Sequence, residues 1–296
     1  MSKVWFITGA SRGLGLEIAR TLLDAGHQVV ATARRPDQIE TALSGYGDQL
    51  LAIALDVTQP AQAEAAVAAT KDRFGRIDVL VNNAGYGQLG WFENVSDEQV
   101  RAQFEVNLFG AMNVTRAVLP VMREQRSGHV FTVSSVSGLV SVPGATIYAG
   151  SKFAVEGWME GLVGELKPLG IKATTIEPGF FRTDFLDSSS VNYGAHDLPE
   201  YAEVSAKFRA WHDEMNHQQV GDPAKLGVLL MNVATWTSPR LGLRQAATGH
   251  SGPERRANSS RRRPPGGASF RHPPMVTSRP TSRPLACPDW VVRVQS

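Results

Sequence analysis

Four polar residues in the middle of the chain have the types and spacing that proton transfer requires. Tyr148 and Lys152 stand four residues apart in a segment of helical character, so they share one face of a helix. Ser135 lies 13 residues before Tyr148, at the end of an apolar run, and Asn107 stands at the start of a long helical stretch. A tyrosine hydroxyl can donate a proton to a carbonyl oxygen, and a serine hydroxyl can hydrogen-bond that oxygen as negative charge develops on it.

The pKa of the tyrosine decides whether this chemistry can run near neutral pH. Free tyrosine has a pKa of about 10, which is too high for ready proton exchange. A cation at Lys152 and an oxidised nicotinamide would each stabilise tyrosinate, so we expect them to lower the pKa of Tyr148. Singly, each residue has an ordinary explanation as a surface, strand-end or helix-cap residue. Their joint occurrence, in this order, behind a glycine-rich turn favours a catalytic site.

The glycine-rich turn lies between the first apolar run and a helix, where residues 8–15 read Thr-Gly-Ala-Ser-Arg-Gly-Leu-Gly. Glycine lets the backbone approach a dinucleotide pyrophosphate closely, and the N-terminus of a helix supplies free N–H groups and a positive dipole end. This context favours a dinucleotide site over an ordinary tight turn. Residues 9–13 also match the Gly-x-Ser-x-Gly nucleophile elbow of hydrolases, but the eight residues before them cannot supply the earlier strands and the oxyanion loop.

Two arginines indicate which dinucleotide binds. An acidic residue after the second strand would accept the ribose 2′-hydroxyl of NAD, but that run ends in Ala33, Arg34 and Arg35. Arg34 and Arg12 could hold a 2′-phosphate with bidentate geometry. We interpret Arg35 as a solvated surface charge. The sequence therefore favours NADP.

Alternating elements must position these residues. Apolar runs at 3–8, 28–33, 50–55, 78–81, 129–133 and 171–176 predict buried strands. Helices are predicted at 13–25, from Pro36, at 60–73, from a Ser96–Gln99 capping box, and at 107–126, 146–167 and 222–234. Six alternations with short connections indicate an α/β fold, a doubly wound parallel sheet in a Rossmann-like single domain.

These motifs together resemble the short-chain dehydrogenase/reductase family in its compact single-domain form, over residues 3 to about 234. The resemblance rests on Gly9, Gly13, Gly15, Asp56, Asn82, Ala84, Gly85, Asn107, Ser135, Tyr148, Lys152, Pro178, Gly179 and Thr183. It implies that Tyr148 is the general acid/base and that Lys152 holds the nicotinamide ribose and lowers the tyrosine pKa. It further implies that Ser135 polarises the substrate oxygen and that Asn107 supports a water-linked proton relay.

The same resemblance implies a cofactor site and an NADP-dependent oxidoreductase acting on a carbonyl or a secondary alcohol. The implied cofactor residues are Gly9, Ser11, Arg12, Gly13, Leu14, Gly15, Arg34, Asp56, Val57, Asn82, Ala84, Gly85, Tyr148, Lys152, Pro178, Gly179 and Thr183. Two alternatives are a non-catalytic NADP-binding regulator and a nucleotide-sugar epimerase. The complete Ser-Tyr-Lys set argues against the first, and the glycine spacing and the lack of a large substrate domain argue against the second.

An aromatic-rich segment marks the substrate side. The chain from 180 to 221 is predicted to be irregular and, by resemblance, forms a mobile lid over the substrate. Its apolar and aromatic residues suit a small-molecule carbonyl or alcohol with a bulky hydrophobic body, although many of these residues could be core. Tyr86, Leu89, Trp91 and Phe92 would line another wall, with Val142 and Pro143 beside Tyr148. Three histidines in the segment, at 196, 212 and 217, follow no metal-ligand pattern, so we predict no metal site. The family resemblance also implies a homodimer or homotetramer, formed through helices 107–126 and 146–167.

The last fifth of the chain differs from the rest in composition. The 296 residues have a net charge of +2, but residues 238–296 hold 11 arginines and two carboxylates, +9 in all, which leaves −7 for the remainder. The single cysteine, Cys287, excludes an internal disulfide framework. Without a signal-peptide core or a long apolar run, we expect a cytoplasmic protein that binds no membrane.

We therefore predict two regions: an NADP-binding catalytic domain over 1–240 and a low-complexity, disordered Arg/Pro-rich tail over 241–296. The tail could be a basic arm for nucleic acid, but it has no lysine, few aromatic residues and no amphipathic period, so we predict no nucleic-acid binding. Our preferred hypothesis is out-of-frame translation of a GC-rich gene from about 233–245, which could leave an inactive product. Resequencing the locus tests this hypothesis, because an intact reading frame would refute it.

Overall fold

The main sheet confirms the predicted doubly wound topology. The computed structural model describes residues 2–188, 190–235, 243–244 and 292–295. Its main sheet has the strand order β3-β2-β1-β4-β6-β7-β10-β9, and the first six of these strands run parallel. They are β1 (Val4–Thr8), β2 (Gln28–Ala33), β3 (Leu50–Ala54), β4 (Val79–Asn82), β6 (Gly128–Val133) and β7 (Ile171–Pro178).

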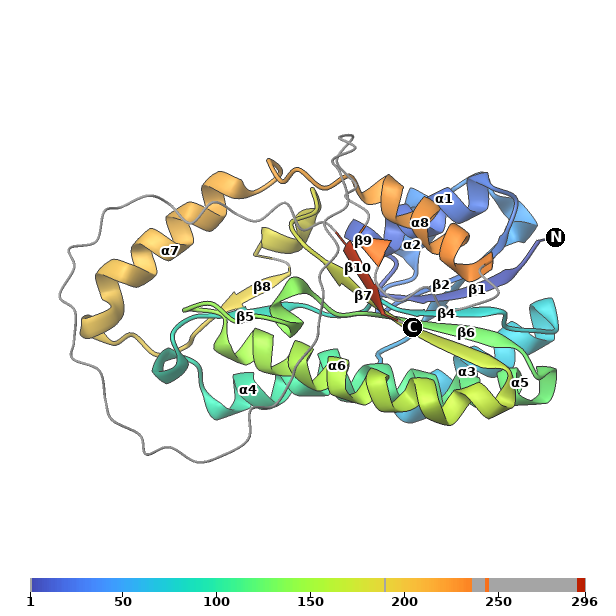
Figure 1. Cartoon of the computed structure of the whole chain (residues 1–296). Coiled ribbons are helices and arrows are strands. Elements are labelled where there is room, and N and C mark those ends of the chain that lie inside the picture. The colour runs from blue at the N-terminus through green and yellow to red at the C-terminus, as the bar shows by residue number, and fades with distance from the viewer. Residues whose placement is uncertain (1, 189, 236–242, 245–291, 296) are drawn as a thin grey trace, which may run out of the picture.

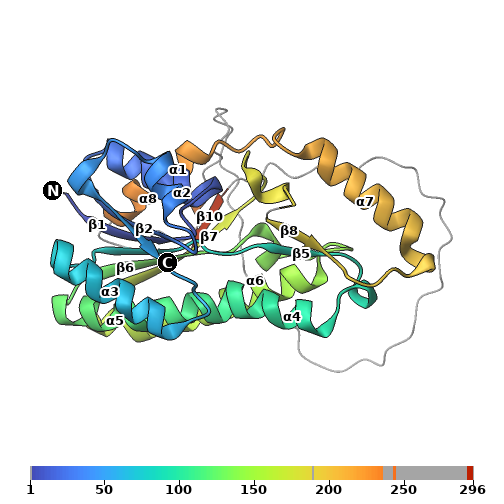
Figure 2. The ribbon, with the colours of Figure 1, turned by 180° about the vertical axis from the view of Figure 1, so that it is seen from behind.

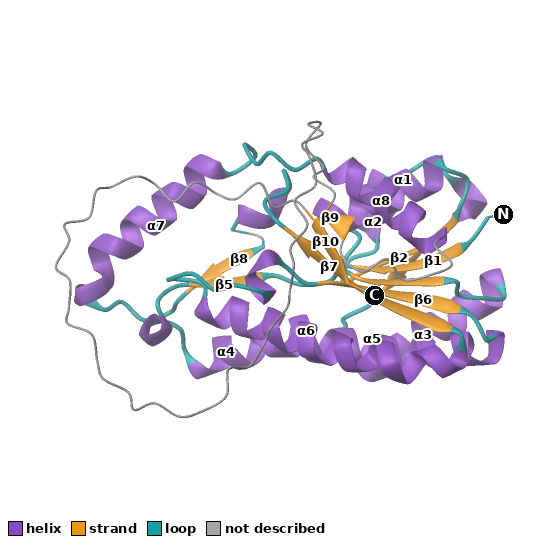
Figure 3. Cartoon of the chain, in the orientation of Figure 1, coloured by secondary structure: helices purple, strands orange, loops and turns teal. Residues whose placement is uncertain are grey.

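Helices cover both faces of this sheet (Figures 1 and 2). One face carries α1 (Gly13–Asp24), α2 (Asp37–Ala42) and α8 (Pro223–Thr235). The other face carries α3 (Pro60–Phe74), α4 (Asp97–Phe104), α5 (Ala111–Gln125) and α6 (Thr146–Leu166). Short 3-10 turns lie at Gly47–Gln49, Phe92–Asn94, Val136–Gly138, Lys167–Leu169, Asp184–Leu186 and Pro199–Tyr201. Figure 3 shows the resulting three layers by element type.

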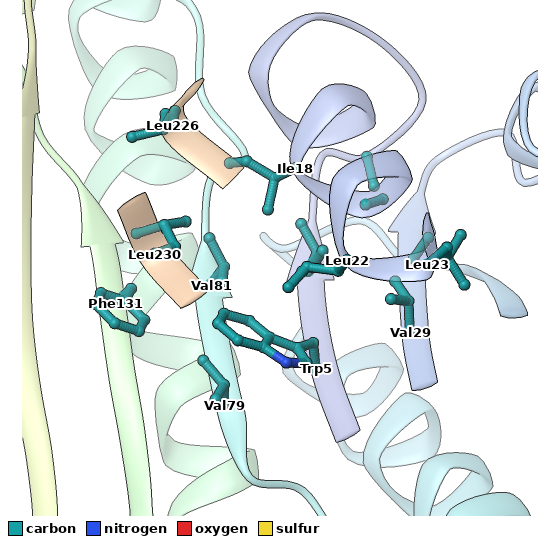
Figure 4. Packing of buried hydrophobic residues seen from close by; sticks show 14 of the residues in the cluster. Trp5, Ile18, Leu22, Leu23, Val29, Val79, Val81, Phe131, Leu226 and Leu230 are labelled. Atoms are coloured by element: carbon teal, nitrogen blue, oxygen red, sulfur yellow. The ribbon is translucent and has the colours of Figure 1, made fainter. Parts of the chain in front are cut away.

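Two hydrophobic cores fill the spaces between these layers. Along β1, Trp5 and Ile7 belong to the core under α1 and α8, whereas Val4 and Phe6 belong to the core over α3, α5 and α6. Figure 4 shows the first core, where Trp5 lies among side chains of α1, α8 and the neighbouring strands. Because helices cover both faces, the strands appear in the sequence as continuous apolar runs rather than alternating ones.

The parallel strands end along one rim of the sheet, and this rim collects the predicted site. The glycine turn follows β1, the Asn-Asn-Ala-Gly run begins at the end of β4, Ser135 follows β6, and Pro178 ends β7. Neighbouring strand ends are in register, as Thr8 with Thr32 and Val133 with Ile176. Open α/β sheets bind ligands at this rim.

Two predictions of local structure are wrong. The segment 180–221 is not irregular, because it contains β8 (Val191–Tyr193) and α7 (Ala202–Met215), and β8 pairs in parallel with β5 (Gly87–Leu89). A three-residue strand is set by a pairing distant in sequence, so local pattern could not reveal it, but Val204, Phe208 and Met215 have helical spacing that does indicate α7. Asn107 does not open a helix either, since it lies in a π-helical segment, Glu105–Gly110, that joins α4 to α5.

The C-terminal region contributes two strands that the sequence analysis does not predict as a pair. β9 (Leu243–Arg244) pairs antiparallel with β10 (Val292–Gln295), and β10 pairs antiparallel with β7 at the sheet edge. The rest of the predicted disordered tail, including Cys287 and the arginine run at 261–263, lies outside the described residues.

Candidate active site

The turn after β1 has the shape of a dinucleotide cradle. Gly9 has a φ of +66°, a left-handed conformation that side chains rarely adopt. A Cβ atom on Gly15 would collide with the carbonyl oxygen of Gly9 and with the side chain of Asn83. In the described part of the chain, the first turn of α1 holds no acidic side chain. The side chain of its N-cap residue, Arg12, makes no capping hydrogen bond to the helix. The turn and the helix N-terminus together fit a pyrophosphate.

Asn83 is a functional residue that the sequence analysis missed. Its Nδ2 donates to the carbonyl oxygens of Thr8 (2.9 Å) and Gly9 (3.0 Å). The backbone N–H groups of Asn83 and Ala84 each donate to Oγ1 of Thr8 at 3.0 Å. These bonds tie the end of β4 to the glycine turn, so they hold the cradle in shape. The signal was present in the Asn-Asn-Ala-Gly run, but its two asparagines have different roles.

Asn82, the first of these asparagines, supports the site through buried hydrogen bonds to neighbouring elements. Its buried Nδ2 donates to Thr115 Oγ1 (2.8 Å) on α5 and to Thr132 Oγ1 (3.3 Å) on β6. These contacts join β4 to its neighbours. The side chain therefore acts on the predicted cofactor site through the strand end rather than through the turn itself.

The other predicted cofactor residues border the same rim. Thr183 lies against the turn, since a Cβ on Gly13 would be 3.7 Å from Thr183 Cβ. Arg12 and Arg34 are exposed, the first in the turn and the second directly after β2. Oδ1 of Asp56 accepts from N (3.0 Å) and Oγ1 (2.8 Å) of Thr58, so in this structure the carboxylate closes a turn. The remaining predicted positions are Ser11 and Leu14 in the glycine turn, Val57 after β3, Gly85 after β4, and Pro178 and Gly179 at the end of β7.

The structure brings the predicted catalytic residues together. Tyr148 and Lys152 lie on one face of α6, with 9% and 6% of their surfaces exposed. Nζ of Lys152 donates to the carbonyl oxygen of Val133 at the end of β6 (2.8 Å) and lies 5.9 Å from the centre of the Tyr148 ring. Ser135, 8% exposed, follows β6 and hydrogen-bonds with Tyr148. The β6 end and the first turns of α6 thus meet at the rim.

Burial sets the proton affinities of this group. It raises the pKa of Tyr148 to about 12, while the hydrogen bond with Ser135 acts in the opposite direction. Burial lowers the pKa of Lys152 to about 8, and the carboxylate of Glu156 opposes this shift. Desolvation of the phenolate thus opposes the lowering of the Tyr148 pKa that the Lys152 cation and an oxidised nicotinamide are predicted to cause. Tyr148 is protonated at neutral pH and Lys152 is largely cationic.

Asn107 is buried in the π-helical segment behind Tyr148, where its side-chain amide hydrogen-bonds with both backbone groups of Tyr86. Oδ1 accepts from the N–H of Tyr86 (3.1 Å), and Nδ2 donates to the carbonyl oxygen of Tyr86 (3.1 Å). Nδ2 also donates to Oγ of Ser151 (3.3 Å), which in turn donates to the Tyr148 carbonyl oxygen (2.7 Å). Single π turns inside helices are frequent at functional sites. Ser151, between Tyr148 and Lys152, is a second residue that sequence reasoning missed.

Apolar side chains also pack around Tyr148. Its ring lies 5.8 Å from that of Phe185, and it shares a cluster with Leu89, Leu186 and Val191. A cavity of about 580 Å³ opens next to this cluster, lined by the chain directly after β5, by the end of β8 and the loop after it, and by α7. Trp91, Tyr193 and Phe208 line it together with Arg209 and His196. The predicted wall residues Leu89 and Trp91 are thus placed beside the site, whereas Phe92 and Val142 are exposed.

In the described part of the chain, one group of acidic and histidine side chains comes close enough together to hold a metal ion. Asp184, Asp187 and His217 form a group whose possible ligand atoms all lie within 4.8 Å of one another, and Nε2 of His217 lies 3.3 Å from Oδ1 of Asp187. Nδ1 of His212 lies 2.8 Å from the Phe208 carbonyl oxygen, in a packing contact. No helix in the described part of the chain is long and apolar enough to cross a membrane.

A dinucleotide cradle beside a buried Ser-Tyr-Lys set defines the class of protein as an oxidoreductase that uses a nicotinamide dinucleotide. The profile of the short chain dehydrogenase family matches residues 3–193. Oxidoreductase BOA17 of Botryotinia fuckeliana (strain B05.10) is 41% identical over 244 residues, which are 82% of this chain and 88% of that protein. The chain therefore belongs to the short-chain dehydrogenase family.

Two crystal structures have the same fold. A short-chain dehydrogenase from Streptomyces avermitilis is 39% identical, with a TM-score of 0.72 over 80% of this chain and 86% of that one. A short-chain dehydrogenase/reductase from Burkholderia phymatum, solved in complex with NAD, is 25% identical, with a TM-score of 0.70 over 78% of this chain and 85% of that one.

Proposed function

We propose that this protein is an NADP-dependent carbonyl reductase or alcohol dehydrogenase acting on a bulky hydrophobic substrate. The observation that carries the proposal is the meeting of Ser135, Tyr148 and Lys152 at the rim next to the glycine turn. A non-catalytic nucleotide-binding regulator would need the turn but not this buried set. The family shares fold and cofactor chemistry, and the polar groups of the site indicate the reaction.

Each residue has a role that follows from its place. The bound nicotinamide supplies the hydride. Tyr148, protonated by virtue of a pKa of about 12, donates its proton to the substrate oxygen. Ser135 hydrogen-bonds the same oxygen and stabilises the charge that develops on it. The Lys152 cation, held by the Val133 carbonyl oxygen, stabilises the tyrosinate left behind.

Arg12 and Arg34 support a preference for NADP. Both are exposed, on either side of the β1–β2 strand ends where the adenosine ribose of a dinucleotide would lie. Guanidinium groups there would pair with a 2′-phosphate, and the two residues directly after β2 are arginines rather than a carboxylate that could accept a 2′-hydroxyl. Asp56 would contact the adenine through the turn that its carboxylate closes. Asn107 would support a proton relay to Lys152 from the π-helical segment.

The apolar surroundings of Tyr148 support a hydrophobic substrate. Phe185, Leu89 and Leu186 are packed near the phenol ring, and the aromatic-lined cavity extends from this cluster toward α7. Sites of this kind bind ligands through apolar area and orient them with few polar groups. The wall from 86 to 92 and the chain around α7 would enclose such a substrate.

The extent of the catalytic domain and its assembly into oligomers are two further proposals. We infer that the catalytic domain extends to about residue 240, since α8 ends at Thr235 and a match of 244 residues covers 88% of a relative. We also propose a homodimer or homotetramer through the helices around 107–126 and 146–167. Phe109 and Phe153, on these helices, are large apolar side chains that are nearly half exposed.

A substrate screen with matched variants tests the function. Oxidation of NADPH and NADH is followed over a panel of apolar ketones and aldehydes. We expect turnover with NADPH, its loss in Tyr148→Phe, and nearly unchanged NADPH binding in that variant. Arg34→Ala should lower the preference for NADPH over NADH, whereas Arg35→Ala serves as the matched control. NADPH binding without turnover across the panel would favour the regulator instead.

A further inference from the structure

One face of α4 and the following π-helical segment carries three side-chain amides at four-residue spacing. They belong to Gln99, Gln103 and Asn107, and residues four apart share a helix face. Each amide clasps the backbone of a segment outside the helix with both its oxygen and its nitrogen. We call this set the amide ladder.

Gln103 is the fully buried middle rung, with 0% of its surface exposed. Its Oε1 accepts from the N–H of Gln88 (2.6 Å), and its Nε2 donates to the carbonyl oxygen of Tyr86 (3.0 Å). Gly87 lies between these two residues, and its N–H donates on the opposite edge of β5, to the carbonyl oxygen of Ser190 next to β8 (2.9 Å). On the free edge of β5, the side-chain amide of Gln103 therefore forms the hydrogen bonds that a neighbouring strand would form.

The outer rungs hold the two ends of the same small sheet. At the β8 end, Nε2 of Gln99 donates to the carbonyl oxygen of Tyr193 (2.9 Å), and its Oε1 accepts from the N–H of Ala195 (3.0 Å). At the start of β5, Asn107 clasps Tyr86. A sheet of two three-residue strands is not stable by itself, so its position depends on these contacts.

This small sheet forms the wall next to the general acid. A Cβ on Gly87 would be 3.3 Å from the Phe185 ring, and that ring lies 5.8 Å from the ring of Tyr148. Leu89 of β5 and Val191 of β8 belong to the cluster that surrounds Tyr148. A shift of β5 would therefore move the apolar groups against which a substrate rests, while the glycine turn would remain in place.

We propose that Gln103 is a positioning residue that sets the distance between the β5–β8 wall and Tyr148, with Gln99 holding the lid end of the same wall. The residue is fully buried and acts through the backbone of Tyr86 and Gln88. Its effect should fall on KM for the carbonyl substrate, because the wall contacts the substrate, and not on NADPH binding. The kinetic part of this inference rests on the proposed function.

The chain offers a matched control in Gln125 of α5. Its Oε1 accepts from the N–H of Ile77 (3.0 Å), and its Nε2 donates to the Ile77 carbonyl oxygen (2.8 Å). The clasp is of the same kind, but Ile77 precedes β4 and so lies at the opposite rim of the sheet. Gln103→Leu and Gln125→Leu each remove one amide clasp of comparable geometry.

The first experiment uses amide hydrogen exchange of the full-length protein and no substrate. In Gln103→Leu, exchange over residues 86–89 and 191–195 should accelerate about tenfold, the effect expected from loss of a buried hydrogen bond. Gln125→Leu should accelerate exchange around residue 77 and leave 86–89 unchanged. Unchanged exchange at 86–89 in Gln103→Leu would overturn the proposal, even if the wild-type protein turned over no carbonyl and the proposed function failed.

The second experiment separates positioning from simple destabilisation. Gln103→Leu should raise KM for the carbonyl about tenfold, with smaller changes in kcat and in the Kd for NADPH, and Gln125→Leu should change none of these. Gln103→Glu can replace both hydrogen bonds only when its buried carboxyl is protonated. Its KM should therefore approach that of the wild type at pH 6 and exceed it at pH 8. Equal KM changes in both leucine variants, or no pH dependence in Gln103→Glu, would refute the positioning role.

Discussion

The low pKa of Lys152 predicts a measurable stability cost for the catalytic site. The ordinary lysine value is 10.5, and burial lowers the pKa of Lys152 to about 8. Between these values the unfolded chain therefore binds more protons than the folded protein, so the free energy of unfolding rises with pH. The cost of burying the ammonium group is absent above pH 10.5, where this lysine is neutral in both states. The cost grows as the pH falls and is complete below about pH 8. The total difference corresponds to about 3 kcal/mol of unfolding free energy, of which about 2.5 kcal/mol falls between pH 7 and pH 10.

The assay is urea denaturation of the wild type and of Lys152→Met, a variant of similar shape without the charge, at pH 7, 8, 9 and 10. The stability of the wild type relative to the variant should rise by about 2.5 kcal/mol across this range. The variant should also have lost turnover, since the tyrosinate is no longer stabilised. The relevant comparison is between the two proteins, because tyrosines and other lysines titrate in both. Parallel stability curves from pH 7 to 10 would refute the reasoning that desolvation controls this lysine.

Three further predictions concern the turn, a helix cap and the core. Gly15→Ala should weaken NADPH binding at least tenfold in a fluorescence titration, because the new methyl group has no space beside the Gly9 carbonyl oxygen; unchanged affinity would contradict the cradle geometry. Ser96→Ala removes the capping box of α4 and should cost about 1 kcal/mol in urea denaturation, whereas Ser96→Asp should cost less. Burial lowers the pKa of His129 to about 3. The contribution of the neutral, buried ring to the free energy of unfolding is therefore fully present above pH 6.5 and is lost as the pH falls toward 3. Relative to His129→Gln, the wild type should lose about 2 kcal/mol between pH 7 and pH 5, and a constant difference would show that the ring is not held neutral.

Much of the fold was predictable because local chemistry and tertiary environment agree. The six strands were recognised as apolar runs since both faces of the sheet are covered, and the glycine turn was recognised because few residues can form it. The family match over residues 3–193 agrees with motifs that were identified by order and spacing. In contrast, β5 and β8 depend on each other across about a hundred residues, so no window of sequence indicates either strand.

The sequence by itself determined the six parallel strands, most of the helices between them, and the residue types available for chemistry, because these depend on periodicity, glycine geometry and the acid–base properties of side chains. Only the tertiary structure decided what each polar side chain touches. Asn82 and Asn83 are adjacent and identical in type, yet one joins strands and the other shapes the cradle, since β4 ends at Asn82 and Asn83 lies in the loop that follows it. The pKa of Tyr148 was likewise beyond reach of the sequence, because it depends on how much water the fold leaves around the hydroxyl group.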